Sequence, residues 1–203
     1  MNAVVSRAPP VAAVVTALLL LAGCGSGVQQ HEIVKVLRAG LTSQDPSTVC
    51  EGSLTPALLT RIYGGVGECH VTEGEPGERI SQALSVDVSR VHVRRGHATA
   101  VVTLHGGSHD GARGALMLTR RNGAWLVSDL STGLLRSQFE ATLRRAQGLV
   151  PGARGCIADR MRRLADTDFR RLAMSAVDAG QERVASVARY CFARIAAAAR
   201  LRV

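Results

Sequence analysis

Cys24 is the residue whose neighbours most clearly indicate chemistry. It ends the stretch ALLLLAGC (17–24), where an apolar run that begins at Val11, downstream of Arg7, gives way to small residues. A positively charged start, an apolar middle and small residues at a cleavage point are the three parts of a secretory signal peptide. The run is well short of the roughly 20 apolar residues that a membrane-spanning helix needs. Residues 1–23 are therefore predicted to direct export and to be removed.

The residues Leu21, Ala22, Gly23 and Cys24 resemble the lipobox of bacterial lipoproteins. In that family the cysteine sulfur receives diacylglycerol, and cleavage makes the cysteine the new N-terminus. The resemblance implies a protein anchored by acyl chains such as palmitate to the extracytoplasmic face of the cell membrane. Each buried methylene contributes about 0.8 kcal/mol, so several chains hold a protein there almost permanently. The alternative is a secreted protein with a chance cysteine at the cleavage site.

Four further cysteines remain, Cys50, Cys69, Cys156 and Cys191. An even number in an exported chain indicates a disulfide framework, and four cysteines allow three pairings. They fall into two well-separated sets, which favours Cys50 with Cys69 and Cys156 with Cys191. A zinc site is the alternative, but the sequence contains no Cys-x-x-Cys. We expect no metal and no cofactor.

No group of residues has the spacing of an active site. Ser108, His109 and Asp110 have the residue types of a hydrolase triad, but neighbours in one loop cannot orient one another for proton transfer. Asp87 and Asp129 are the carboxylates on predicted strands, where such residues are usually solvated. We therefore assign no catalytic residue.

The first half of the chain is predicted to fold as helices followed by an antiparallel sheet. After a tether over 24–30, apolar residues at helical spacing indicate a helix over 31–41. Asp45-Pro46 begins a second, short helix, and residues 56–62 form a third. The glycines at 64, 65 and 67 indicate a turn.

From residue 84 the apolar period changes to two, which indicates strands. Arg95-Gly96 and Asn122-Gly123 provide two-residue hairpin turns, and the second turn pairs Leu118 with Val127.

The first turn places Val91 and Val93 beside Ala98 and Ala100 on one apolar face. The opposite, wetter face and the loop after it carry four candidate metal ligands, His92, His97, His105 and His109. Imidazole suits Zn and Cu. A solvated sheet face is the favoured interpretation.

Helices followed by a curved meander that ends in RRNGAWLVSDL (120–130) resemble the nuclear transport factor 2-like group. Its cone-shaped fold is shared by ketosteroid isomerase, scytalone dehydratase and many actinobacterial lipoproteins. In those lipoproteins a segment similar to QDPSTVCEGSLTPAL (44–58) carries a cysteine that pairs with a second one downstream. The resemblance covers about residues 28–132 and implies a cavity between the helices and the concave face of the sheet.

The resemblance implies two opposite functions. An isomerase of this group needs a carboxylate base and an oxyanion donor, such as a tyrosine, in an apolar cavity. Tyr63 and Tyr190 are the two tyrosines of the chain. A non-catalytic binding or scaffolding domain is the favoured expectation, and an isomerase-like or dehydratase-like enzyme is the alternative.

The last third of the chain is basic and predicted to be helical. Residues 141–203 contain 13 arginines and five acidic residues. Such a surface suits nucleic acid or an anionic membrane. Export argues against nucleic acid, so contact with anionic lipid competes with a merely solvated helix face.

Taken together, the sequence predicts an α+β protein with N-terminal helices packed on a curved antiparallel sheet, followed by a small all-α module with a disulfide. The predicted parts are a signal peptide (1–23), a tether (24–30), a nuclear transport factor 2-like domain (31–132) and an arginine-rich helical module (133–203). The expected function is that of a membrane-tethered lipoprotein with a non-catalytic domain, whose protein or ligand partner the sequence does not identify.

Overall fold

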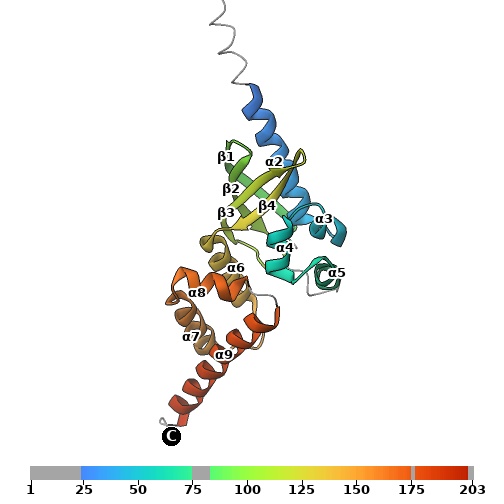
Figure 1. Cartoon of the computed structure of the whole chain (residues 1–203). Helices are drawn as coiled ribbons and strands as arrows, with labels where there is room; N and C mark the ends of the chain where they lie inside the picture. The colour runs from blue at the N-terminus through green and yellow to red at the C-terminus, as the bar shows by residue number, and fades with distance from the viewer. Residues whose placement is uncertain (1–23, 75–82, 175–176, 201–203) are drawn as a thin grey trace, which may run out of the picture.

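A computed structural model describes residues 24–74, 83–174 and 177–200 (Figure 1). It has a four-stranded antiparallel sheet in the order β1-β2-β3-β4, with helices before and after the sheet in the chain. The α+β class is therefore confirmed. The predicted signal peptide, 1–23, lies outside the described residues. Within the described ranges, no helix is both long enough and apolar enough to cross a membrane.

Helix α2 (Cys24–Thr42) includes the segment that the sequence predicted to be a tether. The side-chain amide of Gln30 donates to the carbonyl of Val91 on β1 at 3.2 Å. Ile33 and Leu37 of the same helix are buried. Residues 24–30 are thus helical rather than a linker. Glycine favours the helical state poorly, so the packing of α2 against the sheet stabilises this helix.

Two short helices follow, α3 (Pro46–Cys50) and α4 (Pro56–Tyr63), close to where the sequence predicted them. Each begins with proline, whose missing N–H costs nothing at the first helical position. The side chains of Asp45 and Thr55 accept the backbone N–H groups that cap these helices. Local sequence signals are therefore sufficient for both helices.

Helix α5 (Val66–Gly74) was not predicted. Gly64 does end α4 with a positive φ of 95°, as a turn glycine should, but the chain enters α5 directly after Gly65. Gly67, which the sequence assigned to the turn, lies inside this helix.

The sheet comprises β1 (Ser85–Arg94), β2 (His97–His105), β3 (Arg113–Arg121) and β4 (Ala124–Leu130). Burial alternates along β2, so that one face of the sheet packs inward and the other faces solvent.

The two predicted hairpin turns are present. Arg95, Gly96, Asn122 and Gly123 all have positive φ, as the turns that suit two-residue hairpins require. The second turn sets the predicted register, in which Leu118 pairs with Val127.

The first hairpin follows the predicted register only near its turn. Val93 pairs with Ala98, but a β-bulge then shifts β1 at Arg90 and Val91. Arg90 has a φ of 50°, and the extra residue takes Val91 out of alignment with Ala100. No local sequence signal marks this bulge.

In the described residues after the sheet there are four helices, α6 (Thr132–Arg145), α7 (Pro151–Arg162), α8 (Asp166–Ala173) and α9 (Val177–Arg200). Figure 1 shows them gathered at the end of the molecule opposite the start of α2.

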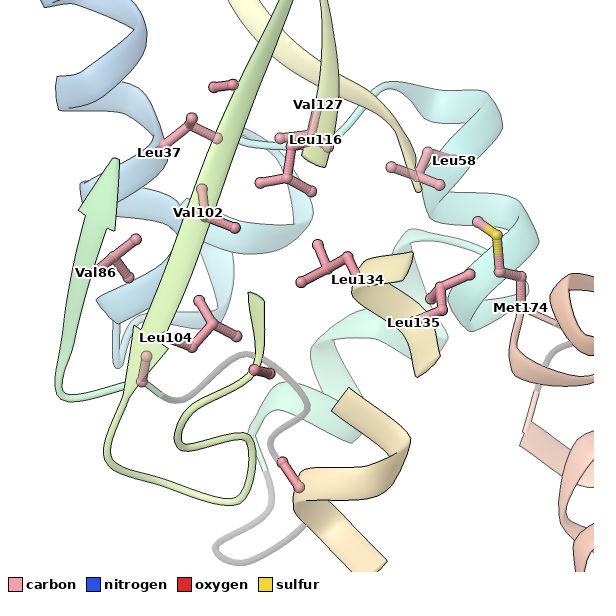
Figure 2. Close-up of a cluster of buried hydrophobic side chains, with 14 of the residues drawn as sticks. Leu37, Leu58, Val86, Val102, Leu104, Leu116, Val127, Leu134, Leu135 and Met174 are labelled. Atoms are coloured by element: carbon pink, nitrogen blue, oxygen red, sulfur yellow. The ribbon is translucent and has the colours of Figure 1, made fainter. Parts of the chain in front are cut away.

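One cluster of buried side chains joins the sheet to the C-terminal helices (Figure 2). Val102 and Leu116 come from the sheet, Leu134 and Leu135 from α6, and Met174 from the end of α8. Side chains from both sides of residue 132, where the predicted domain boundary lies, therefore share one core.

Two disulfides are present, with S–S distances of 2.03 and 2.06 Å. Cys50 is bonded to Cys69, which ties α3 to α5, and Cys156 is bonded to Cys191, which ties α7 to α9. This is the local pairing that the sequence favoured. Sequence separations of 19 and 35 residues correspond to about 3 to 4 kcal/mol each in the chain-entropy account.

The turn at Gly123 generates a stability prediction. A Cβ placed on Gly123 meets no atom within 4 Å, so the cost of a side chain there is conformational and arises from its φ of 84°. We expect Gly123→Val to lower the free energy of unfolding by about 1 to 2 kcal/mol, measured by thermal unfolding. Asn122→Gly is the control and should leave the melting temperature unchanged or raise it. A Gly123→Val protein as stable as the wild type would contradict this turn.

Candidate functional site

A cavity of about 90 Å³ lies between the N-terminal helices and the inner face of the sheet. Its wall is mainly aliphatic, with Val36 and Leu41 from α2 and Leu116 and Val127 from the sheet. The polar residues that line it are Ser53, Tyr63 and Gln138. Its position between helices and sheet is the one at which the resemblance implied a cavity.

The cavity is too small for an ordinary substrate. Pockets that bind small molecules usually measure about 300 to 1,000 Å³. One reason for the small volume is that α2 lies close to Ser53. A Cβ on Gly40 of this helix would lie only 2.5 Å from Oγ of Ser53. That hydroxyl already donates to the carbonyl of Thr48 at 2.7 Å. Aliphatic side chains line the cavity, and the Ser53 hydroxyl is engaged within the protein.

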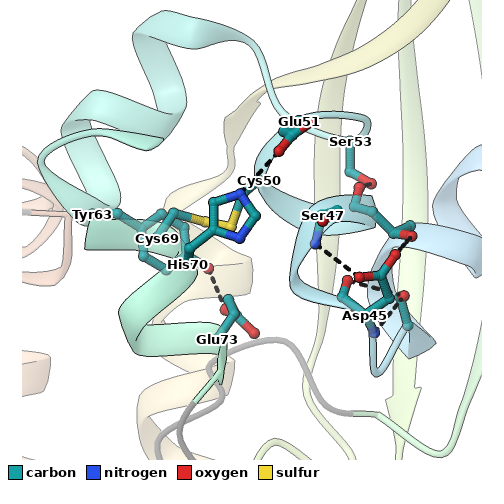
Figure 3. Close-up of a disulfide and its surroundings, with 11 residues drawn as sticks. Asp45, Ser47, Cys50, Glu51, Ser53, Tyr63, Cys69, His70 and Glu73 are labelled. Carbon is teal, nitrogen blue, oxygen red and sulfur yellow. Dashed lines mark hydrogen bonds and ion pairs between the residues drawn. A yellow bond between two sulfur atoms is a disulfide. The ribbon is translucent and has the colours of Figure 1, made fainter. Parts of the chain in front are cut away.

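Tyr63 and Glu73 form a buried pair beside the Cys50–Cys69 disulfide (Figure 3). The tyrosine hydroxyl donates to Oε1 of Glu73 at 2.5 Å, and the two residues are 5% and 3% exposed. Burial, followed by the hydrogen bond and the charge of Glu73, raises the pKa of Tyr63 above the ordinary range of a phenol. The phenol therefore stays protonated and acts as a fixed donor between α4 and α5.

Asp129, one of the two candidate carboxylates, is held by arginines. Nη2 of Arg170 lies 2.7 and 2.8 Å from its two oxygens, and Arg61 lies 3.4 Å away. The other terminal nitrogen of Arg170 donates to the carbonyl of Leu130. This carboxylate attaches α8 to the end of β4, so it is a structural anchor in this arrangement.

The other candidate residues on the sheet are spread over its solvent face. The side chain of Asp87 is 77% exposed, and it lies 2.9 Å from Nε2 of His105. His92 and His97 are exposed. Among the described residues, no three His, Cys, Asp or Glu side chains are grouped closely enough to hold a metal ion.

Residues 108–110 do not act on one another. The carboxylate of Asp110 accepts from the backbone N–H of Gly106 at 2.8 Å and from Arg145 at 2.6 Å. These contacts, the Gly106 N–H first, lower the pKa of Asp110. Nδ1 of His109 lies 3.2 Å from a threonine hydroxyl of α6. The loop is thus fastened to α6, and the three side chains do not form a triad.

The arginine-rich helices use some of their arginines inside the protein. Arg136 donates to the carbonyls of Met161 and Leu164 at 2.9 and 2.7 Å, and its guanidinium lies 4.4 Å from the centre of the Phe169 ring. This arginine therefore bonds the end of α7 while it covers the aromatic ring of α8.

No family model, curated protein or solved structure matches this chain.

Sequence reasoning did not single out Glu73, Arg136 or Arg170, which form close polar contacts in the structure. Glu73 lies in a helix that the sequence did not predict, and its burial depends on Tyr63, ten residues away. Arg136 and Arg170 belong to a basic region in which composition does not separate inward-facing from solvated arginines. The sequence offers one signal that Arg136 lies near the core, because the apolar residues Leu134 and Leu135 precede it in α6 and are buried.

The buried phenol leads to a titration experiment. In a Tyr190→Phe protein, Tyr63 is the remaining tyrosine, and we expect no phenolate absorbance near pH 10 while the protein is folded. The same protein in denaturant should titrate near the ordinary value of about 10. Because the pKa of Tyr63 is higher in the folded state than in the unfolded state, the free energy of unfolding should fall as the pH rises above about 10. Phenolate appearing near pH 10 in the folded protein would contradict the buried pair.

The anchor at Asp129 leads to a comparison of neighbouring arginines. Arg170→Ala leaves the carboxylate and the Leu130 carbonyl without their closest donor, which should cost about 1 to 3 kcal/mol. Arg171, 70% exposed and 3.7 Å from Asp168, is the matched control. Arg171→Ala should change stability by less than about 0.5 kcal/mol. Equal effects of the two substitutions in urea unfolding would show that the Asp129 contact is not an anchor.

Proposed function

We propose that the protein is a lipoprotein tethered to the extracytoplasmic face of the cell membrane through Cys24. The proposal is supported by the lipobox-like residues 21–24 together with the two disulfides. Four of the five cysteines are bonded to one another, so Cys24 has no cysteine of its own chain left to pair with. Two disulfides also suit an oxidising compartment outside the cytoplasm.

Residues 31–132 are proposed to form a nuclear transport factor 2-like domain, and residues 133–203 an arginine-rich helical module. The order of elements supports the first part, because helices precede an antiparallel meander and a cavity lies between them. The size of that cavity supports a non-catalytic role. Binding or scaffolding is the function that this domain is proposed to serve.

An enzyme of the isomerase or dehydratase kind is the second candidate, and the Tyr63–Glu73 pair favours it. Tyr63 lines the cavity, and a protonated tyrosine beside a carboxylate supplies the two groups that such an enzyme needs. Two features argue against an enzyme. The cavity is small, and the phenol already donates its proton in a hydrogen bond to Glu73.

The arrangement of the molecule bears on membrane contact by the arginines. Helix α2 starts at Cys24 at one end, and the C-terminal helices lie at the other (Figure 1). Attraction between exposed charges and anionic lipid is screened over roughly 8 Å at physiological salt. A lipid on Cys24 would therefore leave the arginine-rich helices away from the anchoring membrane, so a different anionic ligand suits them better.

The lipid anchor is tested by Cys24→Ala. Without the sulfur that accepts diacylglycerol, we expect an unprocessed precursor that incorporates no labelled palmitate, detected by fluorography and mass spectrometry. Gly27→Ala lies outside the lipobox-like residues, and processing and labelling should be unchanged. Membrane-bound, processed protein at the wild-type level in Cys24→Ala would show that the lipoprotein proposal is wrong.

A further inference from the structure

A groove of about 530 Å³ lies between α7 and α9. Its lining includes Gly152 and Gly155 of α7 and the bonded pair Cys156 and Cys191. A Cβ on Gly155 would meet no atom within 4 Å, so the glycine leaves open space at the groove. In contrast to the cavity beside the sheet, this groove falls within the size range of small-molecule sites.

The charges around the groove are positive and largely uncompensated. Arg160 of α7, Arg163 directly after that helix and Arg194 of α9 line it. In the part of the chain that the structure describes, none of these three forms an ion pair. Asp159 is the acidic residue of the lining, and Arg162 already neutralises it at 2.8 Å. Three exposed guanidinium groups without a carboxylate partner among the described residues therefore line a space that an anion can fill.

An aromatic ring orients one of these arginines. The guanidinium of Arg160 lies 4.1 Å from the centre of the Tyr190 ring, and Tyr190 also lines the groove. A guanidinium stacked on a ring keeps its N–H groups at the edge, where they can donate to an oxyanion. Holding Arg160 in place before a ligand arrives reduces the entropy that binding must overcome.

We propose that the groove between α7 and α9 binds the phosphate group of a phosphoester ligand. Arginine binds phosphate oxygens through paired, charge-assisted hydrogen bonds, and three arginines from two helices can surround one phosphate. The phosphate can belong to a lipid headgroup or to a soluble phosphoester. The proposed anchor at Cys24 favours a phosphate outside the anchoring membrane, and this choice of source alone rests on the proposed function.

The binding site is tested with sn-glycerol 3-phosphate as the probe and the mature full chain in a zwitterionic detergent, by isothermal titration calorimetry. Arg163→Gln and Arg194→Gln should each weaken binding about tenfold or more, because each removes a charge-assisted bond. Arg189→Gln is the matched control, since Arg189 lies on the same helix about 160° around the axis from Cys191. It should bind as the wild type does. Equal weakening by Arg189→Gln, or no saturable binding by the wild type, would overturn the proposal.

A variant that fills the groove distinguishes binding inside the groove from nonspecific binding to a positively charged surface. Gly155→Leu keeps every charge but fills the groove, and it should abolish binding of glycerol phosphate. Gly155→Ala adds a single methyl group into open space and should bind within about twofold of the wild type. Circular dichroism checks that both proteins remain folded. Unchanged binding by a folded Gly155→Leu protein would place the ligand elsewhere and overturn the proposal.

Vesicles identify the source of the phosphate. Cys24→Ala protein, freed of its signal peptide by expression from residue 24, is mixed with vesicles of phosphatidylglycerol or of phosphatidylcholine. Glycerol phosphate binding without selective vesicle binding supports a soluble phosphoester. If the protein binds selectively to phosphatidylglycerol vesicles and Gly155→Leu abolishes this binding, the groove binds a lipid headgroup. Neither readout depends on a lipid at Cys24. Failure of either measurement therefore leaves the lipoprotein proposal untouched, and failure of lipidation leaves the groove untouched.

Discussion

The attachment of the C-terminal helices to the end of β4 is the constraint on which the remaining structure depends. Arg170 binds both oxygens of Asp129 and the carbonyl of Leu130, at the point where the chain leaves the sheet. Arg136, one turn into α6, bonds carbonyls at the end of α7 and stacks on Phe169. Because guanidinium groups satisfy these carbonyls and the carboxylate, the sheet and the helices can share one apolar core. Without them, that junction would bury polar groups without partners.

This use of arginine explains why composition misleads in the basic third of the chain. The arginines of residues 133–203 include two groups that the sequence does not distinguish, besides exposed arginines such as Arg171. Arg136 and Arg170 are partly buried and bind backbone carbonyls, whereas Arg160, Arg163 and Arg194 surround an open groove. Only the tertiary arrangement separates a structural cation from a free one. The number of arginines therefore overstates the charge available to a partner, while their positions define where that charge is concentrated.

The features that sequence reasoning predicted have local causes. Asn122-Gly123 accepts positive φ, the prolines of α3 and α4 occupy first helical positions, and Cys50–Cys69 and Cys156–Cys191 are the local pairings. The features it missed have distant causes. The bulge at Arg90, the helical state of residues 24–30 and the buried Glu73 each depend on contacts with other elements. For the same reason the small volume of the cavity could not be predicted, since it depends in part on the close approach of Gly40 to Ser53.

The helical state of residues 24–30 matters for the proposed lipoprotein. A flexible tether of seven residues would span about 15 Å and would let the body of the protein turn its basic end toward the membrane. Helix α2 instead continues from Cys24 into the core through Ile33 and Leu37, so the orientation of the anchor point is coupled to that of the sheet. A helix of 19 residues is about 28 Å long, well beyond the screening length of exposed charges. The proposed anchor and the groove between α7 and α9 are thus held at opposite ends of one packed body. That geometry suits a protein that presents a cationic site away from the membrane that holds it.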